Sequence, residues 1–103
     1  MNPYNVCIAY VSWEDGGKHR PVLVIAQGNG YTEVFRITSQ YANKSDAIKA
    51  RYFEISDWKQ AGLAKPSYID TVKSVEMPTP LLSTPIGKIS DNDKLRLIEF
   101  LNN

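Results

Sequence analysis

The stretch that decides the fold is residues 13–27, which read WEDGGKHRPVLVIAQ. Its first half is charged and holds two glycines, which adopt backbone conformations that other residues avoid. A proline then fixes φ and biases the preceding residue, Arg20, towards an extended backbone. The apolar, β-branched run at 22–26 is typical of a buried strand. We therefore expect a polar loop over residues 13–19 anchored on a core strand, with Arg20 at a junction that combines access with rigid positioning.

Length and composition predict one domain that spans residues 1–103. The chain has 43% hydrophobic and 22% charged residues and a formal net charge of +1, as expected for a globular protein with one core. This charge argues against a sequence-independent nucleic-acid coat, but it leaves room for one local basic site. No apolar run approaches the ~20 residues that span a bilayer, and the N-terminal residues lack the features of a signal peptide.

The single cysteine, Cys7, lies within an apolar run at 6–11. We interpret it as a small buried hydrophobe in a reducing compartment, and therefore expect a cytoplasmic protein. One cysteine and one histidine do not supply a zinc site. The expected chemistry is accordingly metal-free, with no cofactor.

Short strands separated by turns are expected on both sides of the opening stretch. Gly-Asn-Gly at 28–30 is a tight-turn signal, and residues 31–38 alternate between polar and apolar with one break, as in a half-exposed, bulged strand. Further expected elements are strands at 6–11, 51–55 and 67–77, an exposed loop at 39–50, a helical turn at 56–62 capped by Ser56 or Asp57, and a final helix at about 90–102 that begins with a capping box at Ser90. This order predicts a mainly β fold, either a small, strongly bent β-barrel or an open sheet, with the C-terminal helix against its flank.

Arg20 and Thr38 are the strongest candidates for a functional pair. Arg20 begins the eight residues that precede the 28–30 turn, and Thr38 is the eighth residue after it. Antiparallel pairing would place the two side chains next to each other at one rim of the sheet. A guanidinium and a hydroxyl suit a phosphate, since one binds its oxygens and the other orients them. Spacing alone equally allows an exposed arginine and a strand-terminating threonine.

A series of short motifs runs along the chain: Glu14 before two glycines, RPVLVI at 20–25, ITSQ at 37–40, DW at 57–58, AGL at 61–63, KPS at 65–67 and GKIS at 87–90. In this order the motifs resemble the MazF/PemK family of bacterial toxin endoribonucleases. The resemblance implies an SH3-like small β-barrel, as in MazF, PemK and CcdB, which is usually a homodimer. It also implies the toxin of a type II toxin–antitoxin system, an mRNA interferase that cleaves single-stranded RNA at short sequence motifs without a metal. The 2′-hydroxyl attacks the adjacent phosphate and leaves a 2′,3′-cyclic phosphate and a 5′-hydroxyl.

The resemblance also implies roles for particular residues. Arg20 matches the catalytic arginine of the family, which would stabilise the pentacoordinate phosphate and could protonate the leaving oxygen. Thr38 matches the active-site threonine, which would position the phosphate. PemK-like members carry Arg-x-Asp where this chain has YID at 68–70, so the acid is present and the arginine is replaced by Tyr68. Asp70 is either a general base for the 2′-hydroxyl or a surface carboxylate paired with a lysine.

The remaining site candidates keep more than one interpretation each. His19 is either an acid–base catalyst, because histidine titrates near neutral pH, or a solvated loop side chain. Trp13 either stacks on a base or closes the core. Glu14 orders the loop, contacts substrate or takes part in catalysis. The lysines of the 39–50 loop either contact the RNA backbone or are solvated. The predicted substrate-binding residues are Trp13, Glu14, Gly17, Ser39, Lys44 and Lys49.

The expected partners are single-stranded RNA and a cognate antitoxin, with no membrane. The antitoxin would supply an acidic, partly disordered segment that lies over the Arg20 groove. A rival hypothesis is a catalytically silent SH3-like module that only binds a protein partner. The tyrosine at position 68 supports this rival, because a fold by itself does not prove activity.

Overall fold

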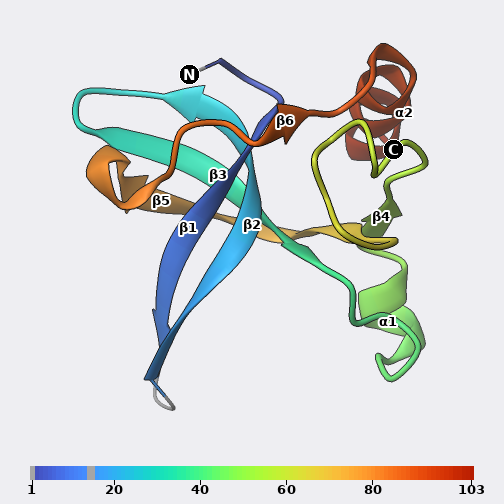
Figure 1. Cartoon of the computed structure of the whole chain (residues 1–103). Coiled ribbons are helices and arrows are strands. Elements are labelled where there is room, and N and C mark those ends of the chain that lie inside the picture. The colour runs from blue at the N-terminus through green and yellow to red at the C-terminus, as the bar shows by residue number, and fades with distance from the viewer. Residues whose placement is uncertain (1, 14–15) are drawn as a thin grey trace.

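The structure is a computed structural model that describes the backbone of residues 2–13 and 16–103 and the side chains of residues 2–10 and 19–103. The mainly β fold with a C-terminal helix expected from the sequence is confirmed (Figure 1). In chain order the elements are β1 (Asn5–Trp13), β2 (Gly16–Gln27), β3 (Tyr31–Thr38), α1 (Asp46–Lys49), β4 (Tyr52–Glu54), β5 (Tyr68–Pro78), the 3₁₀ helix η1 (Thr79–Leu81), β6 (Gly87–Lys88) and α2 (Asp91–Leu101).

The described strands form one antiparallel sheet in the order β4-β5-β3-β2-β1-β6. Figure 1 shows its strong twist, with β1 and β2 crossing the direction of β5. Two bulges accompany this bend. β2 gains a residue on β3 between Val24 and Ala26, and β5 gains residues where β3 runs from Val34 to Arg36. The bulge expected within residues 31–38 therefore lies in the two strands that flank β3.

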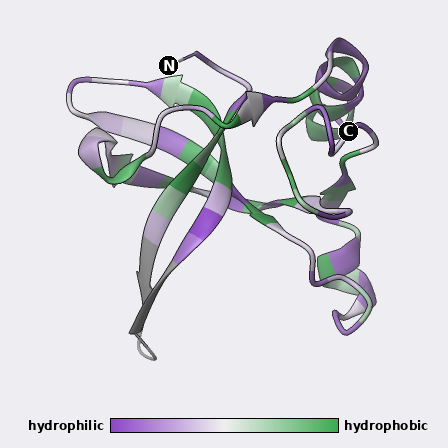
Figure 2. Ribbon diagram, in the orientation of Figure 1, coloured by the Kyte–Doolittle hydropathy of each residue, from purple (hydrophilic) through white to green (hydrophobic). Residues whose placement is uncertain are grey.

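The apolar run of β2 is buried on both faces of the sheet. Leu23 packs into a core with Val6 and Ile37, whereas Val22 and Val24 pack into a second core on the other face. Because successive side chains of a strand point to opposite faces, two covered faces require a continuous apolar run. Figure 2 shows the transition along β2 from hydrophilic residues to this hydrophobic segment. Burial of each Val or Leu contributes roughly 1.5–3 kcal/mol.

Cys7 lies in the second core and is fully buried, as predicted. Burial raises the pKa of its thiol, so the side chain stays uncharged at neutral pH. It therefore acts as a small apolar residue in the packing of the sheet.

Within the polar half of the opening stretch, residues 13 and 16–19 are strand, not loop. β2 begins at Gly16 and pairs with β1 in a continuous register that starts at Trp13↔Gly16. The predicted loop over residues 13–19 is therefore wrong for residue 13 and for residues 16–19. Backbone hydrogen bonds to β1 hold this segment extended, and strand pairing does not require apolar side chains on every face.

Two connecting segments also differ from expectation. The 39–50 loop contains α1, one helical turn capped by the Ser45 hydroxyl, which accepts from the Ile48 amide at 3.3 Å. Residues 56–62 form hydrogen-bonded turns that include one helical turn, in which the Ala61 amide donates to the Asp57 carbonyl at 3.2 Å, and Gly62 ends them with φ +84° as predicted. Only the predicted caps differ. Neither predicted cap acts there, because the Asp57 carboxylate instead accepts from the Ser90 hydroxyl at 2.6 Å.

Ser90 caps α2 as predicted, since its hydroxyl accepts from the Asp93 amide at 3.1 Å. The acid of the expected capping box has a different role. Asp93 is fully buried, its carboxylate accepts from the Ser56 and Asp57 amides at 3.2 and 2.8 Å, and it pairs with Arg96 at 2.6 Å. This carboxylate ties the start of α2 to the turn that follows β4.

α2 packs against the flank of the sheet, as expected. Leu97 is buried in the first core, and the Phe100 ring meets the Phe53 ring edge-on at 5.5 Å between centroids. Leu95 on the opposite side of the helix is 67% exposed. Among the described residues, α2 included, no helix combines the length and the apolar character needed to cross a membrane.

Candidate functional site

A row of paired residues crosses the sheet near the end of β3 and carries charge. Arg36 on β3 is paired with Asp70 on β5, and Asp70 with Tyr52 on β4. On its other side Arg36 is paired with Val22 on β2. Paired residues of adjacent antiparallel strands point to the same face. The side chains of Arg36, Asp70 and Tyr52 are therefore neighbours.

A second row lies two residues along the same strands, and so on the same face. It pairs Thr38 of β3 with Tyr68 of β5. Extending the register by two residues beyond Val22↔Arg36 brings Arg20 opposite Thr38. The structure therefore gathers Arg20, Thr38 and Asp70, which the sequence analysis selected separately, on one face of the sheet.

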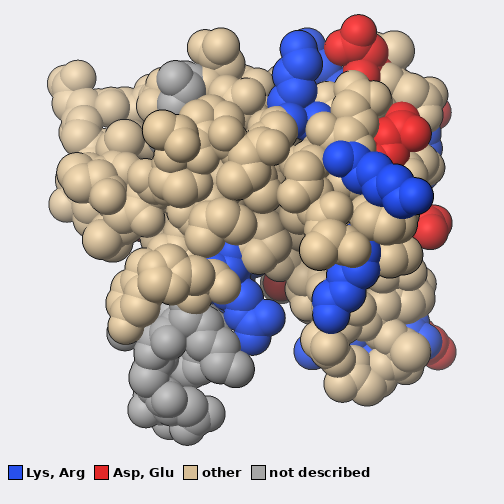
Figure 3. Space-filling view, viewed as in Figure 1, with Lys and Arg blue, Asp and Glu red and all other residues tan. Residues whose placement is uncertain are grey.

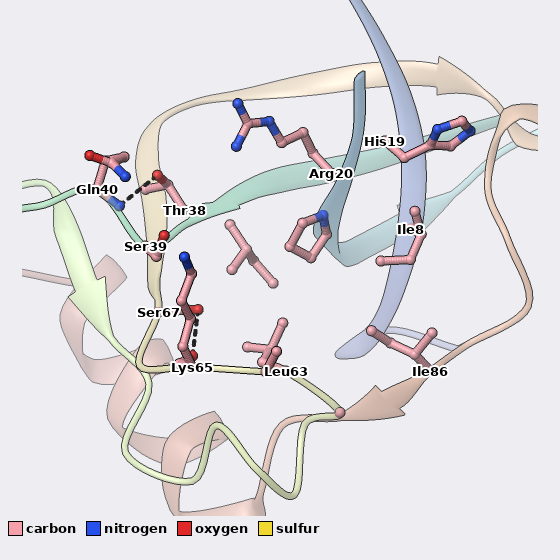
Figure 4. Close-up of a pocket in the computed structure, with 14 residues that line it drawn as sticks. Ile8, His19, Arg20, Thr38, Ser39, Gln40, Leu63, Lys65, Ser67 and Ile86 are labelled. Carbon is pink, nitrogen blue, oxygen red and sulfur yellow. Dashed lines mark hydrogen bonds between the residues drawn. The ribbon is translucent and has the colours of Figure 1, made fainter. Parts of the chain in front are cut away.

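Two clefts meet at Arg20 and Thr38, and Figure 3 shows a hollow on this side of the molecule with Lys and Arg side chains on its flanks. The charged cleft has a volume of about 520 Å³ and is lined by Arg20, Arg36, Ile37, Thr38, Gln40, Lys44, Tyr52 and Asp70. The apolar cleft, seen in Figure 4, has a volume of about 400 Å³ and is lined by Ile8, Pro21, Ile37, Leu63 and Ile86 together with polar residues that include His19, Arg20, Thr38, Ser39, Gln40, Lys65 and Ser67.

The charged cleft gathers the three cations Arg20, Arg36 and Lys44 around the carboxylate of Asp70. The pKa of Tyr52 is raised, first by burial and then by the charge of Asp70, while Arg36 lowers it. The Tyr52 hydroxyl therefore keeps its proton at neutral pH and can donate a hydrogen bond. An excess of positive charge with hydroxyl donors is an environment that suits a phosphate.

Thr38 holds its hydroxyl in a defined orientation. Its Oγ1 accepts from the Gln40 amide at 3.0 Å, so its own hydrogen can be donated to a bound anion (Figure 4). In the same view the Arg20 side chain extends towards Thr38 and Gln40, whereas the His19 ring is directed to the other side of the strand. The His19 ring instead meets the Tyr10 ring edge-on, with 5.4 Å between centroids. The structure thus brings Thr38 to Arg20 and separates the His19 ring from it.

The other substrate-binding candidates are only partly placed at the clefts. Lys44 lines the charged cleft and Ser39 lines the apolar cleft. Glu14 lies outside the residues that the structure describes. The side chains of Trp13 and Gly17 also lie outside them. Their backbones are strand residues, with Trp13 paired with Gly16 and Gly17 paired with Ser12.

Lys49 and Tyr68 contribute to an aromatic cluster that holds the 39–50 loop. The Tyr68 ring stacks on the Tyr41 ring with 4.3 Å between centroids and 12° between planes. The Lys49 Nζ lies 5.2 Å from the Tyr41 centroid, and the Tyr52 ring lies 6.4 Å from it. Position 68, to which the resemblance assigns an arginine, is here a packing position.

Close backbone approach positions one wall of the apolar cleft. A Cβ on Gly87 would lie 2.5 Å from the Ala61 carbonyl oxygen, and a Cβ on Gly62 would clash with the Ile86 carbonyl. Two glycines therefore let the turn after β4 lie directly against β6. That contact brings Leu63 and Ile86 to the same cleft.

The sequence analysis did not select Arg36, Gln40 or Tyr52 as functional residues. For Arg36 a signal existed, because it is a charged residue between Phe35 and Ile37 where the alternation of β3 breaks. Gln40 lies only two residues beyond Thr38, and its amide donates to the Thr38 hydroxyl, so its place in the sequence was a signal as well. Tyr52 reaches the site only through the pairing of β4 with β5, a contact between distant segments that local patterns do not encode.

This bent antiparallel sheet followed by a C-terminal helix is the MazF-like toxin fold. Among solved structures, the chain is similar to the Mycobacterium tuberculosis toxin MazF-mt6, with a TM-score of 0.73 and 22% sequence identity over 96% of this chain and 93% of that one. No protein-family model matches the sequence, and no curated protein matches it. The likeness establishes the fold, and activity has to be argued from the site.

Proposed function

We propose that the protein is the toxin of a type II toxin–antitoxin system and a metal-independent endoribonuclease that cleaves single-stranded RNA at short sequence motifs. The observation that carries the proposal is the position of Arg20 and Thr38 between two clefts, with Asp70 on the same face. Cleavage of a phosphodiester by its own 2′-hydroxyl needs a cation, a donor that orients the phosphate and a base. These three residues supply those groups.

In the proposed reaction Asp70 takes the proton of the 2′-hydroxyl as its oxygen attacks the adjacent phosphorus. Arg20 stabilises the negative charge that builds on the pentacoordinate phosphate, and the Thr38 hydroxyl donates to a phosphate oxygen. The bond from phosphorus to O5′ then breaks, which yields a 2′,3′-cyclic phosphate and a 5′-hydroxyl. Water supplies the proton to O5′, because a guanidinium does not lose its proton in proteins.

Each cleft has a part in this proposal. The charged cleft holds the sugar–phosphate backbone. The apolar cleft, where Leu63 and Ile86 face polar groups such as Ser39 and Ser67, takes a base next to the cleaved bond. A pocket for a base provides a physical basis for cleavage at short motifs.

The deciding experiment incubates purified, antitoxin-free protein with long single-stranded RNA in EDTA. We expect cuts at recurrent short sites, and fragments whose new 5′ ends accept a label from polynucleotide kinase without prior dephosphorylation. Intact RNA, obtained with folded protein and several substrates, would contradict the nuclease function. That outcome would favour the catalytically silent binding module.

Variants at Asp70 and His19 separate the two candidate proton acceptors. Asp70→Asn is expected to slow cleavage by about 10²–10⁴-fold, the usual cost of losing a general base, while His19→Gln changes the rate by less than about threefold. The asparagine keeps an oxygen for the Val72 amide, which donates to Asp70 at 2.9 Å, so the local turn is preserved. Initial rates on one RNA measure both variants. The reverse order of effects would move the acid–base role to His19.

We further propose a cytoplasmic homodimer that a cognate antitoxin neutralises. An acidic antitoxin segment would complement the charged cleft, in which three cations and one carboxylate are found among the described lining residues. Expression of the protein alone should stop growth, and co-expression of the neighbouring small gene should restore it.

A further inference from the structure

Arg36 has no part in the reaction proposed above, yet it shares the face of the catalytic pair. It lies two residues from Thr38 along β3 and lines the charged cleft. Its cross-strand partner Asp70 accepts a hydrogen bond from the Val72 amide at 2.9 Å, and among the described residues the two side chains form no ion pair. Within the part of the chain that the structure describes, the Arg36 guanidinium has neither a hydrogen bond nor an ion pair. It is therefore available to a ligand.

Lys44 enters the same cleft from the 39–50 loop, and the loop is held in place. The Lys44 amide donates to the Tyr41 carbonyl at 3.0 Å, and the Tyr41 ring is stacked on Tyr68 at 4.3 Å. Lys49 lies over the same ring, with its Nζ 5.2 Å from the centroid. The lysine is thus attached to the residue that anchors the loop to β5. A cation held in this way loses less conformational freedom when it binds an anion.

Among the described residues that line the cleft, the cations exceed what one phosphodiester requires. A phosphodiester carries a single negative charge, and the cleft contains Arg20, Arg36 and Lys44 against the carboxylate of Asp70. If Arg20 serves the cleaved phosphate, Arg36 and Lys44 remain for another anion. Two strand residues span about 7 Å, so Thr38 and Arg36 are about that far apart along β3. Both residues line the charged cleft, which therefore has room for two anion positions.

We propose that Arg36 and Lys44 form a second phosphate-binding subsite, which holds the RNA phosphate adjacent to the cleaved one. The inference rests on the proposed nuclease function and extends it to the length and register of the substrate. Two bound phosphates fix the strand along the sheet, so that the correct 2′-hydroxyl lies beside Asp70. RNA with a single phosphodiester should accordingly be a poor substrate.

The first test measures the coupling between Arg36 and one phosphate. A short RNA with one cleavage site is prepared in versions that carry an uncharged methylphosphonate at either phosphodiester flanking the cleaved one. For the wild type, one of these versions should lower kcat/KM by about 10–100-fold, the range expected for one lost charge-assisted contact. The Arg36→Gln variant should already have a lower kcat/KM on the unmodified RNA. Replacing the same phosphate by methylphosphonate should lower its kcat/KM by less than about a further twofold, since the contact to that phosphate is already absent. An equal loss in wild type and variant would overturn the subsite.

The second test measures binding and does not depend on cleavage. A fluorescein-labelled 2′-O-methyl RNA resists attack by its own 2′-oxygen, and its affinity is followed by anisotropy over a range of salt concentrations. Arg36→Gln and Lys44→Gln should each reduce the slope of log K against log salt by about 0.7, the value for one phosphate contact on a single strand. The matched control is Lys88→Gln on β6, an exposed lysine that lines neither cleft, which should leave the slope unchanged.

The two tests separate failure of the subsite from failure of the nuclease function. Wild-type protein that cuts RNA but shows unchanged slopes in both variants would overturn the subsite alone. Protein that cuts no RNA yet loses slope in both variants would retain the phosphate subsite and remove the nuclease function. Arg36→Lys should restore part of the slope, and thermal unfolding close to wild type should exclude a loss of structure.

Discussion

Arg20→Ala is expected to slow RNA cleavage by about 10²–10³-fold, because it removes the cation that faces the developing charge of the pentacoordinate phosphate. The side chain is only partly buried and lies at the rim of the sheet, outside both cores. Its loss should therefore leave the fold intact. Initial cleavage rates in EDTA, together with circular dichroism and thermal unfolding of the same samples, measure both effects.

Thr38→Val provides a graded comparison for Arg20→Ala. It keeps the volume of the side chain and removes one neutral hydroxyl contact, so cleavage should fall by only about 2–10-fold. Normal cutting by folded Arg20→Ala protein would contradict the assigned mechanism. A larger loss for Thr38→Val than for Arg20→Ala would mean that the order of importance within the pair is reversed.

Asp93→Ala should produce the largest loss of stability that a single substitution outside the clefts causes. The buried carboxylate accepts from the Ser56 and Asp57 amides and pairs with Arg96. Arg96 is 40% exposed and keeps the Glu54 carbonyl and the Ser56 hydroxyl as acceptors. Removal of the Asp93 carboxylate leaves the two amides without their acceptor, which should cost about 3–5 kcal/mol of the free energy of unfolding in total. For a chain of this size, that loss corresponds to a decrease in Tm of about 15–30 °C.

Asp91→Ala is the matched control for this substitution. Asp91 is also an acid in the first turn of α2, but it is exposed. Its removal weakens only the interaction with the helix dipole, and should shift Tm by no more than a few degrees. Urea unfolding of both variants and the wild type checks the difference. Equal effects of the two substitutions would show that the buried network contributes nothing beyond helix capping.

Local patterns predicted the elements that depend on local energetics. The apolar run of β2 follows from the burial of its side chains. The turn at residues 28–30 follows from the positive φ that glycine allows, and the Ser90 cap follows from the unpaired amides at the start of α2. The loop predicted at 16–19 failed because its backbone is held by β1, a partner that local composition does not reveal. The short helix α1 was missed because one polar turn has no hydrophobic period.

Position 68 illustrates how the site depends on the fold. From the sequence, the replacement of an arginine by Tyr68 removes a cation from the neighbourhood of Asp70. In the structure Tyr68 stacks on Tyr41. Arg36 on the adjacent strand β3 lies opposite Asp70 in the strand register. A cation is therefore present on this face of the sheet, supplied by a strand that lies more than thirty positions away in the chain.

The sequence by itself determined the apolar parts of the long strands, the hairpin that aligns Arg20 with Thr38, and the start of the final helix, because periodicity, turn chemistry and capping act over a few residues. Only the tertiary structure decided which side chains share the clefts. The pairing of β3 with β5 and of β5 with β4 brought Arg36, Asp70 and Tyr52 into one row, and the buried Asp93 joined α2 to the turn after β4. Such contacts depend on strand register and on burial shared between distant segments, which the sequence of one segment does not contain.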